Sequence, residues 1–372
     1  MNGAHSASPE ASWVAYNSFN GRFSDNPRAI YEELAGRVGG LTHVWTAKDS
    51  PRDVFPEEAT PVLFESDEHL RGVARSKFVV SNVEMRETLQ KAPGVVFLQT
   101  WHGTPLKRIG YDNRYVKANP AGFERDVREY ERWDYLISPN PFSSEIFRED
   151  AFRGFAGEIL ETGYPRNDAL NAPDRDEVRG RVRAALGIEA DQSVVLYAPT
   201  WRDNLFHEEG PSSFSLTLDV EQIAERLGND HVILLRLHFL VAAEVADAVG
   251  SAARNVSAYP DIRELYLAAD VLITDYSSSM FDFAVTGKPM VFFAYDLDFY
   301  RDEMRGFYFD FEAEAPGPIC RTSDEVVSVL ADRDQVLAPY RERYERFAER
   351  YCSLEDGHAS RRVVDRVFSE LL

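Results

Sequence analysis

The sequence lacks a long apolar run, an apolar leader and closely spaced cysteines. No apolar stretch in its 372 residues approaches the roughly 18 that span a bilayer, and residues 1–12 hold no apolar core of a signal peptide. The two cysteines, Cys320 and Cys352, are too far apart for a C-x-x-C motif, which argues against a disulfide framework and a thiolate metal site. We therefore expect a cytoplasmic protein.

Positive charge is also scarce. The net charge of −21 repels polyanions at long range and argues against broad, non-specific attraction to nucleic acid or anionic lipid. Residues 105–132 are the exception, with five acidic residues against seven basic ones: Lys107, Arg108, Arg114, Lys117, Arg125, Arg128 and Arg132. Two interpretations of this segment stay open, a solvated helix face and a patch that faces phosphate or a membrane.

The distribution of apolar residues predicts an α/β fold with two domains. The length favours two domains of roughly 150 to 200 residues, and short apolar runs alternate with stretches of helical periodicity, which is typical of buried parallel strands. We predict strands over 13–16, 95–99, 135–138, 194–198, 232–237, 271–274 and 290–293. We predict helices over 28–38, 176–186, 220–227, 262–269 and 279–285, and a helical end over 335–372.

A cluster of Gly, Pro and Asn residues over 162–174 predicts the domain boundary. We divide the chain into a first domain over 1–165, a second over 166–355 and a final helix over 356–372.

Candidate functional residues directly follow the predicted strands, because ligands bind beyond the carboxyl ends of parallel strands. His102, Gly103 and Thr104 follow the run 95–99. A histidine there is suited to act as a general base, and the glycine permits close approach of a substrate. A histidine that only forms hydrogen bonds within a turn explains this fragment equally well.

A second candidate is the pair Arg236 and His238, which point to the same side if their strand continues that far. Such cations suit a pyrophosphate or a leaving phosphate. The fragment alone slightly favours the alternative, in which Arg236 pairs with an acidic surface residue and His238 begins a loop.

The third and fourth candidates are turns between a strand and a polar segment. Asp275 is followed by Ser277 and Ser278, either of which would cap the next helix, and a helix N-terminus attracts anions. Ordinary capping explains these serines as well. Thr200 and Arg202 follow the strand over 194–198, and Arg202 could grip a phosphate with two hydrogen bonds.

Several strings of the sequence resemble the signature segments of CDP-glycerol glycerophosphotransferases, the polymerases and primases of teichoic acid and capsule. These strings are FNGRFSDNPRAIYEEL (19–34), WHGTPLKRIGYD (101–112), WDYLISPNPFSS (133–144), TGYPRNDAL (162–170), YAPTWRDN (197–204), ITDYSSSMFDFAVTGKP (273–289) and DGHASRRVVD (356–365). They follow one another in the family's order over nearly the whole chain.

The resemblance implies a GT-B fold of two Rossmann-like domains, with the acceptor on the first, the CDP-polyol on the second, and a last helix that returns to the first. It implies no cofactor and no catalytic metal. His102 would be the base, and His238 would stabilise the departing CMP. Ser277 and Ser278 would bind the donor phosphate, Asp275 would lie near the donor polyol, and Arg202 would support phosphate charge. We also predict that Gly103, Thr104, Thr200 and Arg236 bind substrate.

The resemblance also implies that the basic segment after His102 touches the inner face of the membrane. It does not distinguish a glycerol donor from a ribitol donor, or a primase from a polymerase. Two rival functions stay open: a nucleotide-sugar glycosyltransferase or epimerase on the same GT-B scaffold, and a non-catalytic module that binds a polyanionic polymer.

Overall fold

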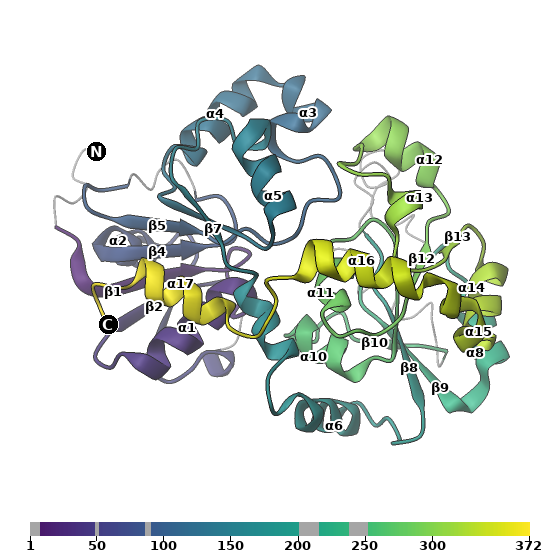
Figure 1. The fold of residues 1–372 in the computed structure, drawn as a ribbon. Coiled ribbons are helices and arrows are strands. Elements are labelled where there is room, and N and C mark those ends of the chain that lie inside the picture. The colour runs from purple at the N-terminus through teal and green to yellow at the C-terminus, as the bar shows by residue number, and fades with distance from the viewer. Residues whose placement is uncertain (1–7, 49–51, 86–90, 201–215, 238–251) are drawn as a thin grey trace. The chain divides into compact units, whose positions relative to one another are not determined.

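The computed structural model describes residues 8–48, 52–85, 91–200, 216–237 and 252–372 (Figure 1). The chain forms two compact units. Unit 1 comprises Met1–Thr104, Ile109–Asp168 and Ser353–Leu372, and unit 2 comprises Pro105–Arg108 and Ala169–Cys352. The chain thus changes unit after Asp168 and after Cys352, where the sequence suggested boundaries after 165 and 355.

Unit 1 is built on a seven-stranded sheet with the order β3-β2-β1-β4-β5-β6-β7, in which every neighbouring pair is parallel. Its strands are β1 (Glu10–Asn17), β2 (Thr42–Ala47), β3 (Ala59–Leu63), β4 (Ser76–Ser81), β5 (Val96–Gln99), β6 (Tyr135–Ser138) and β7 (Glu158–Glu161). Its helices are α1 (Asp25–Arg37), α2 (Asp67–Arg75), α3 (Arg114–Lys117), α4 (Pro120–Tyr130), α5 (Pro141–Ile146) and α17 (Ala359–Val367). The strand order reverses direction between β1 and β4, which defines a topological switch point.

Unit 2 is built on a six-stranded parallel sheet with the order β10-β9-β8-β11-β12-β13. Its strands are β8 (Ser193–Tyr197), β9 (His231–Leu235), β10 (Arg254–Asn255), β11 (Val271–Thr274), β12 (Met290–Phe293) and β13 (Ile319–Cys320). Its helices are α6 (Arg175–Ala185), α8 (Val220–Leu227), α10 (Ile262–Ala268), α11 (Ser279–Ala284), α12 (Leu297–Phe299), α13 (Phe311–Glu314), α14 (Ser323–Ala331), α15 (Arg333–Leu337) and α16 (Arg341–Cys352). The switch point lies between β8 and β11. All seven predicted strands and all five predicted helices are confirmed to within a few residues.

Side-chain caps explain where several helices begin. Asn140 accepts a hydrogen bond from Ser143 N before α5, whose first residue is Pro141. Thr322 and Glu325 form a capping box at the start of α14. These bonds satisfy backbone N–H groups that have no partner within their own helix.

The last helix, α17, packs on unit 1, as predicted. The Asp168 carboxylate accepts hydrogen bonds from Ala359 N (2.9 Å) and Ser360 N (2.7 Å) at the start of α17. Val363 and Phe368 are fully buried in the core of unit 1, where the ring of Phe368 lies 4.9 Å from that of Phe78 on β4. The C-terminal segment therefore completes the apolar core of the first unit.

Candidate active site

The turn that carries His102 follows β5 and is held by side chains from two other segments. Trp101 adopts a left-handed backbone conformation (φ 52°), which is unfavourable for a bulky side chain. Its N–H donates to Gln99 Oε1 at 2.9 Å. The buried Asn26, at the start of α1, donates through Nδ2 to Trp101 O at 3.2 Å and to Thr100 O at 3.4 Å. These bonds fix the backbone immediately before His102.

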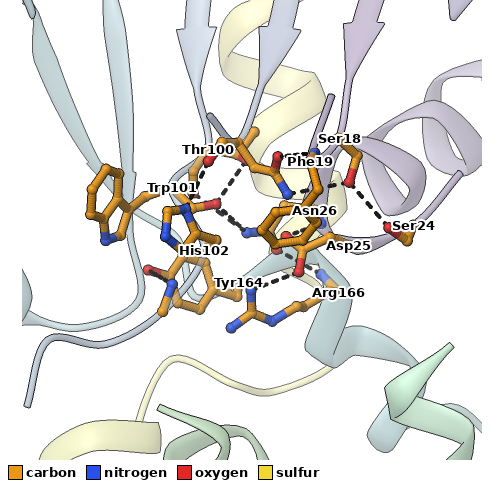
Figure 2. Close-up of polar contacts among 12 residues, drawn as sticks. Ser18, Phe19, Ser24, Asp25, Asn26, Thr100, Trp101, His102, Tyr164 and Arg166 are labelled. Carbon is orange, nitrogen blue, oxygen red and sulfur yellow. Dashed lines mark hydrogen bonds and ion pairs between the residues drawn. The ribbon is translucent and has the colours of Figure 1, made fainter. Parts of the chain in front are cut away.

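The imidazole of His102 is oriented by Asn82, which follows β4. His102 Nδ1 lies 2.8 Å from the backbone oxygen of Asn82. A carbonyl oxygen only accepts hydrogen bonds, so Nδ1 carries the proton and neutral His102 keeps a lone pair on Nε2. The Trp101 ring stacks on the imidazole at 4.5 Å, and the Phe19 ring approaches it edge-on at 5.7 Å (Figure 2). His102 is therefore positioned to accept a proton at Nε2.

A buried ion pair between Arg166 and Asp25 is linked to the His102 turn through Asn26. Arg166 Nη1 contacts Asp25 Oδ2 at 2.9 Å, and both side chains are largely buried. Arg166 N donates to Asn26 Oδ1 at 3.1 Å, so Asn26 connects the ion pair to the His102 turn (Figure 2). Sequence reasoning gave none of these residues a role, although Asp25, Asn26 and Arg166 lie within the strings that carry the family resemblance.

Gly103 and Thr104 are both buried beside His102. Gly103 N donates to the hydroxyl of Tyr164 at 3.1 Å. Thr104 Oγ1 accepts a hydrogen bond from Asn140 Nδ2 at 3.5 Å. The structure thus brings His102, Gly103 and Thr104 together at the carboxyl ends of β5 and β6.

In unit 2, Asp275 and Thr200 meet at the topological switch point. Asp275 follows β11 and is only 2% exposed, and its Oδ1 accepts a hydrogen bond from Thr200 N at 2.9 Å. Thr274 Oγ1 donates to Ala198 O at 2.7 Å, which adds a second link between the ends of β8 and β11. Switch points are where open parallel sheets bind ligands.

The two serines before α11 lie at its start, and one of them is the N-cap residue, as predicted. Ser278 occupies the N-cap position, but its side chain forms no capping hydrogen bond. The Ser277 hydroxyl instead donates to Ser279 Oγ at 2.9 Å and accepts from Ser279 N at 3.2 Å. Ser278 is therefore at the predicted N-cap position, whereas the side-chain hydrogen bonds of the turn come from Ser277.

Arg236 directly follows β9. β9 ends at Leu235, and the expectation that Arg236 and His238 point to one side stays a prediction. Arg236 Nη1 donates to Val256 O at 2.9 Å and to Tyr259 O. His238 and Arg202 lie outside the described residues.

Two other histidines of unit 1, His43 and His69, are more deeply buried than His102. Burial lowers the pKa of His43 to about 4 and also lowers the pKa of His69. His43 Nδ1 contacts the hydroxyl of Tyr16, and His69 Nε2 contacts Thr46 Oγ1, each at 3.1 Å. Both rings are neutral parts of the packed interior, whereas His102 is half-buried.

Comparisons with known proteins agree over nearly the whole chain. The sequence model of the family described as CDP-glycerol:poly(glycerophosphate) glycerophosphotransferase matches residues 2–369. A teichoic acid glycerol-phosphate transferase of Staphylococcus aureus is 41% identical over 97% of this chain and 94% of its own length. A teichoic acid poly(glycerol phosphate) polymerase of Bacillus subtilis is also 41% identical, over 95% of this chain, and the chain spans 48% of that relative.

Solved structures give the same result for the fold. The wall teichoic acid polymerase TagF superposes with a TM-score of 0.90 at 38% identity, over 98% of this chain and 90% of that one. A UDP-GlcNAc 2-epimerase from Neisseria meningitidis superposes with a TM-score of 0.60 at 13% identity, over 96% of this chain and 99% of that one, which is a likeness of fold alone. The two parallel α/β units are those of a GT-B-type fold.

Proposed function

Because the chain belongs to the CDP-glycerol:poly(glycerophosphate) glycerophosphotransferase family, we propose that His102 is the base with which it transfers glycerol phosphate. The chain is a transferase that moves glycerol phosphate from CDP-glycerol onto a poly(glycerol phosphate) acceptor of teichoic acid synthesis. The family match favours glycerol, rather than ribitol, as the polyol of the donor. It argues against the two rival functions, a nucleotide-sugar glycosyltransferase or epimerase and a non-catalytic module that binds a polymer.

The observation that carries the proposal is the contact between His102 Nδ1 and Asn82 O. With its proton held on Nδ1, the imidazole accepts the proton of the acceptor hydroxyl at Nε2 as that oxygen attacks the β-phosphorus of CDP-glycerol. The new bond joins the acceptor oxygen to phosphorus, and the bond from that phosphorus to the bridging oxygen breaks. CMP leaves with the bridging oxygen.

The residues that would hold the donor belong to unit 2. We assign CDP-glycerol to the switch point where Asp275 accepts from Thr200 N, with Ser277 and Ser278 in the following turn. Arg236, fixed by two carbonyl oxygens, would supply positive charge. His238 and Arg202 complete the proposed set, and the departing CMP is assigned to His238.

Release of CMP from CDP-glycerol in the presence of a short glycerol phosphate oligomer tests the assignment of the base. A His102→Gln variant should release CMP at least about 100-fold more slowly than the wild type, because general bases contribute roughly 10²–10⁴-fold. His231→Gln is the matched control, since His231 is a half-buried histidine at the amino end of β9. Equal rates for wild type and His102→Gln would exclude His102 as the base.

We further propose that the enzyme acts in the cytoplasm and contacts the membrane through α3 and α4. Among the described residues, no helix is long and apolar enough to cross a bilayer. Arg114, Lys117, Arg125 and Arg128 are exposed on these helices, and so is Tyr115. Sedimentation with anionic vesicles should capture the wild type but not a variant in which these four cations are changed to Gln, because each cation near an anionic surface contributes about 1 kcal/mol.

A further inference from the structure

Phe19 presents an apolar ring to solvent from an unfavourable backbone conformation. The residue has a φ of 46°, and the left-handed run continues through Asn20 (φ 57°) and Gly21 (φ 136°). A bulky side chain rarely adopts this conformation, yet 41% of Phe19 is exposed. Burial of the ring therefore does not explain why the chain tolerates this strain, and such outliers concentrate at functional sites.

The position of Phe19 is set by the residue that also orients His102. Phe19 N donates to Asn82 Oδ1 at 2.9 Å, and the backbone oxygen of Asn82 contacts His102 Nδ1 at 2.8 Å. Asn82 Nδ2 donates in turn to Ser18 Oγ at 3.2 Å, and Asn82 is fully buried. Asn82 therefore holds the backbone of Phe19 and the imidazole of His102 near each other.

The ring lies against the proposed base and not within the core. Its centroid is 5.7 Å from that of His102, with the ring planes at 62°. Among the described residues, His102 provides the one ring contact of Phe19. Figure 2 shows the Phe19 ring beside His102, on the opposite side from Trp101. The partly exposed Phe19 ring therefore presents an apolar surface beside His102.

We propose that Phe19 is an acceptor-binding residue, on which the carbon backbone of the terminal polyol unit packs while its hydroxyl contacts His102. A polyol chain has C–H groups that pack on an aromatic ring as its oxygens turn toward polar partners, and such contacts contribute to orientation. The inference rests on the proposed function, and it adds a residue that selects and orients the acceptor.

Steady-state kinetics with each substrate varied in turn test the inference. For Phe19→Ala and Phe19→Leu, the KM for a glycerol phosphate oligomer should rise about five- to tenfold, the effect of losing an aromatic contact, while the KM for CDP-glycerol stays within about twofold. Phe299→Ala is the matched control, because Phe299 is a similarly exposed phenylalanine (48%) of unit 2. It should leave both constants unchanged.

A Phe19→Gly variant separates binding from folding. Glycine adopts the left-handed conformation without strain, so this variant should melt no lower than the wild type and still show the raised acceptor KM. An unchanged acceptor KM in all three variants, with an active wild type, would overturn the inference alone. A wild type that releases no CMP from CDP-glycerol would overturn the proposed function and this inference together.

Discussion

Replacing Asn26 with Ala should weaken both the folding of unit 1 and the positioning of His102. Asn26 is fully buried and bonds two separate segments: Nδ2 donates to the oxygens of Thr100 and Trp101, and Oδ1 accepts from Arg166 N. Alanine removes all three bonds and leaves a small void. The change does not touch the atoms of His102, so any effect on catalysis is an effect on position.

The size of the loss follows from which groups keep a partner. Trp101 O retains a hydrogen bond from Thr100 Oγ1 at 3.0 Å, and the bond to Thr100 O is long. Arg166 N loses the 3.1 Å bond in a buried position, which costs about 1–3 kcal/mol. With the weaker bonds to the two carbonyls, we expect a loss of roughly 2–4 kcal/mol in the free energy of unfolding, a large part of the typical 5–15 kcal/mol.

The catalytic effect should appear in kcat. The left-handed Trp101 is held by Gln99 and Asn26, and a shift of about 1 Å in a catalytic group can reduce a rate about 100-fold. Urea unfolding and CMP release measure the two effects. Glu32→Ala on the same helix is the control, because it breaks only an exposed pair with Arg28 and should change stability by less than about 0.5 kcal/mol. If Asn26→Ala matched this control in both measurements, the positioning argument would be refuted.

Three further predictions concern stability and reactivity. Burial lowers the pKa of His43 to about 4, so the unfolded chain binds the proton more tightly than the folded chain. The free energy of unfolding should therefore fall by up to roughly 3 kcal/mol as the pH drops from about 6.5 to 4. Urea unfolding across this range should show a weaker pH dependence for a His43→Gln variant. Gly110→Ala should reduce thermal stability far more than Gly40→Ala. Both glycines have a left-handed backbone, but a Cβ at Gly110 would lie 1.8 Å from Ala151 O, whereas a Cβ at Gly40 would meet open space. Gly40→Ala should therefore cost only the roughly 1–2 kcal/mol of the left-handed conformation. Titration with a thiol reagent should modify the half-buried Cys352 before the buried Cys320, because burial raises the pKa of Cys320 to about 12; faster reaction of Cys320 would contradict this order.

The sequence predicts the central strands well because they are continuous apolar runs. β8, β11 and β12 are covered on both faces and contain few polar residues. Six strands escaped prediction: β2, β3, β4, β7, β10 and β13. Most of them lack this signal, although β4 contains the buried apolar run Phe78–Val80. β3 is an edge strand that contains Pro61, which a central strand would not accept. β10 and β13 are only two residues long and have no period to detect.

The candidate site also contains residues that the sequence identifies and residues that it does not. His102, Gly103, Thr104, Thr200 and Asp275 could be found because each follows an apolar run at the carboxyl end of a strand. Asn82 and Asn26 could not, since their contacts with the His102 turn span 20 and 75 positions of sequence and follow no local pattern. Sequence patterns identify groups that can react, whereas the residues that aim them depend on tertiary contacts.

The strain around His102 shows what this network of asparagines does. The described residues include five non-glycine positions with positive φ, and four of them, Phe19, Asn20, Asp25 and Trp101, lie in the segment 19–26 and in the His102 turn, which hydrogen bonds join. At about 1–2 kcal/mol each, Phe19 and Trp101 would destabilise unit 1 by roughly 2–4 kcal/mol, a large part of the 5–15 kcal/mol that is typical of a folded protein. Asn and Asp adopt this conformation more readily. The hydrogen bonds of Asn26 and Asn82 and the Asp25–Arg166 pair lie in the same segments. If His102 is the base that we propose, these bonds hold the segments in an arrangement that serves the reaction at the expense of stability.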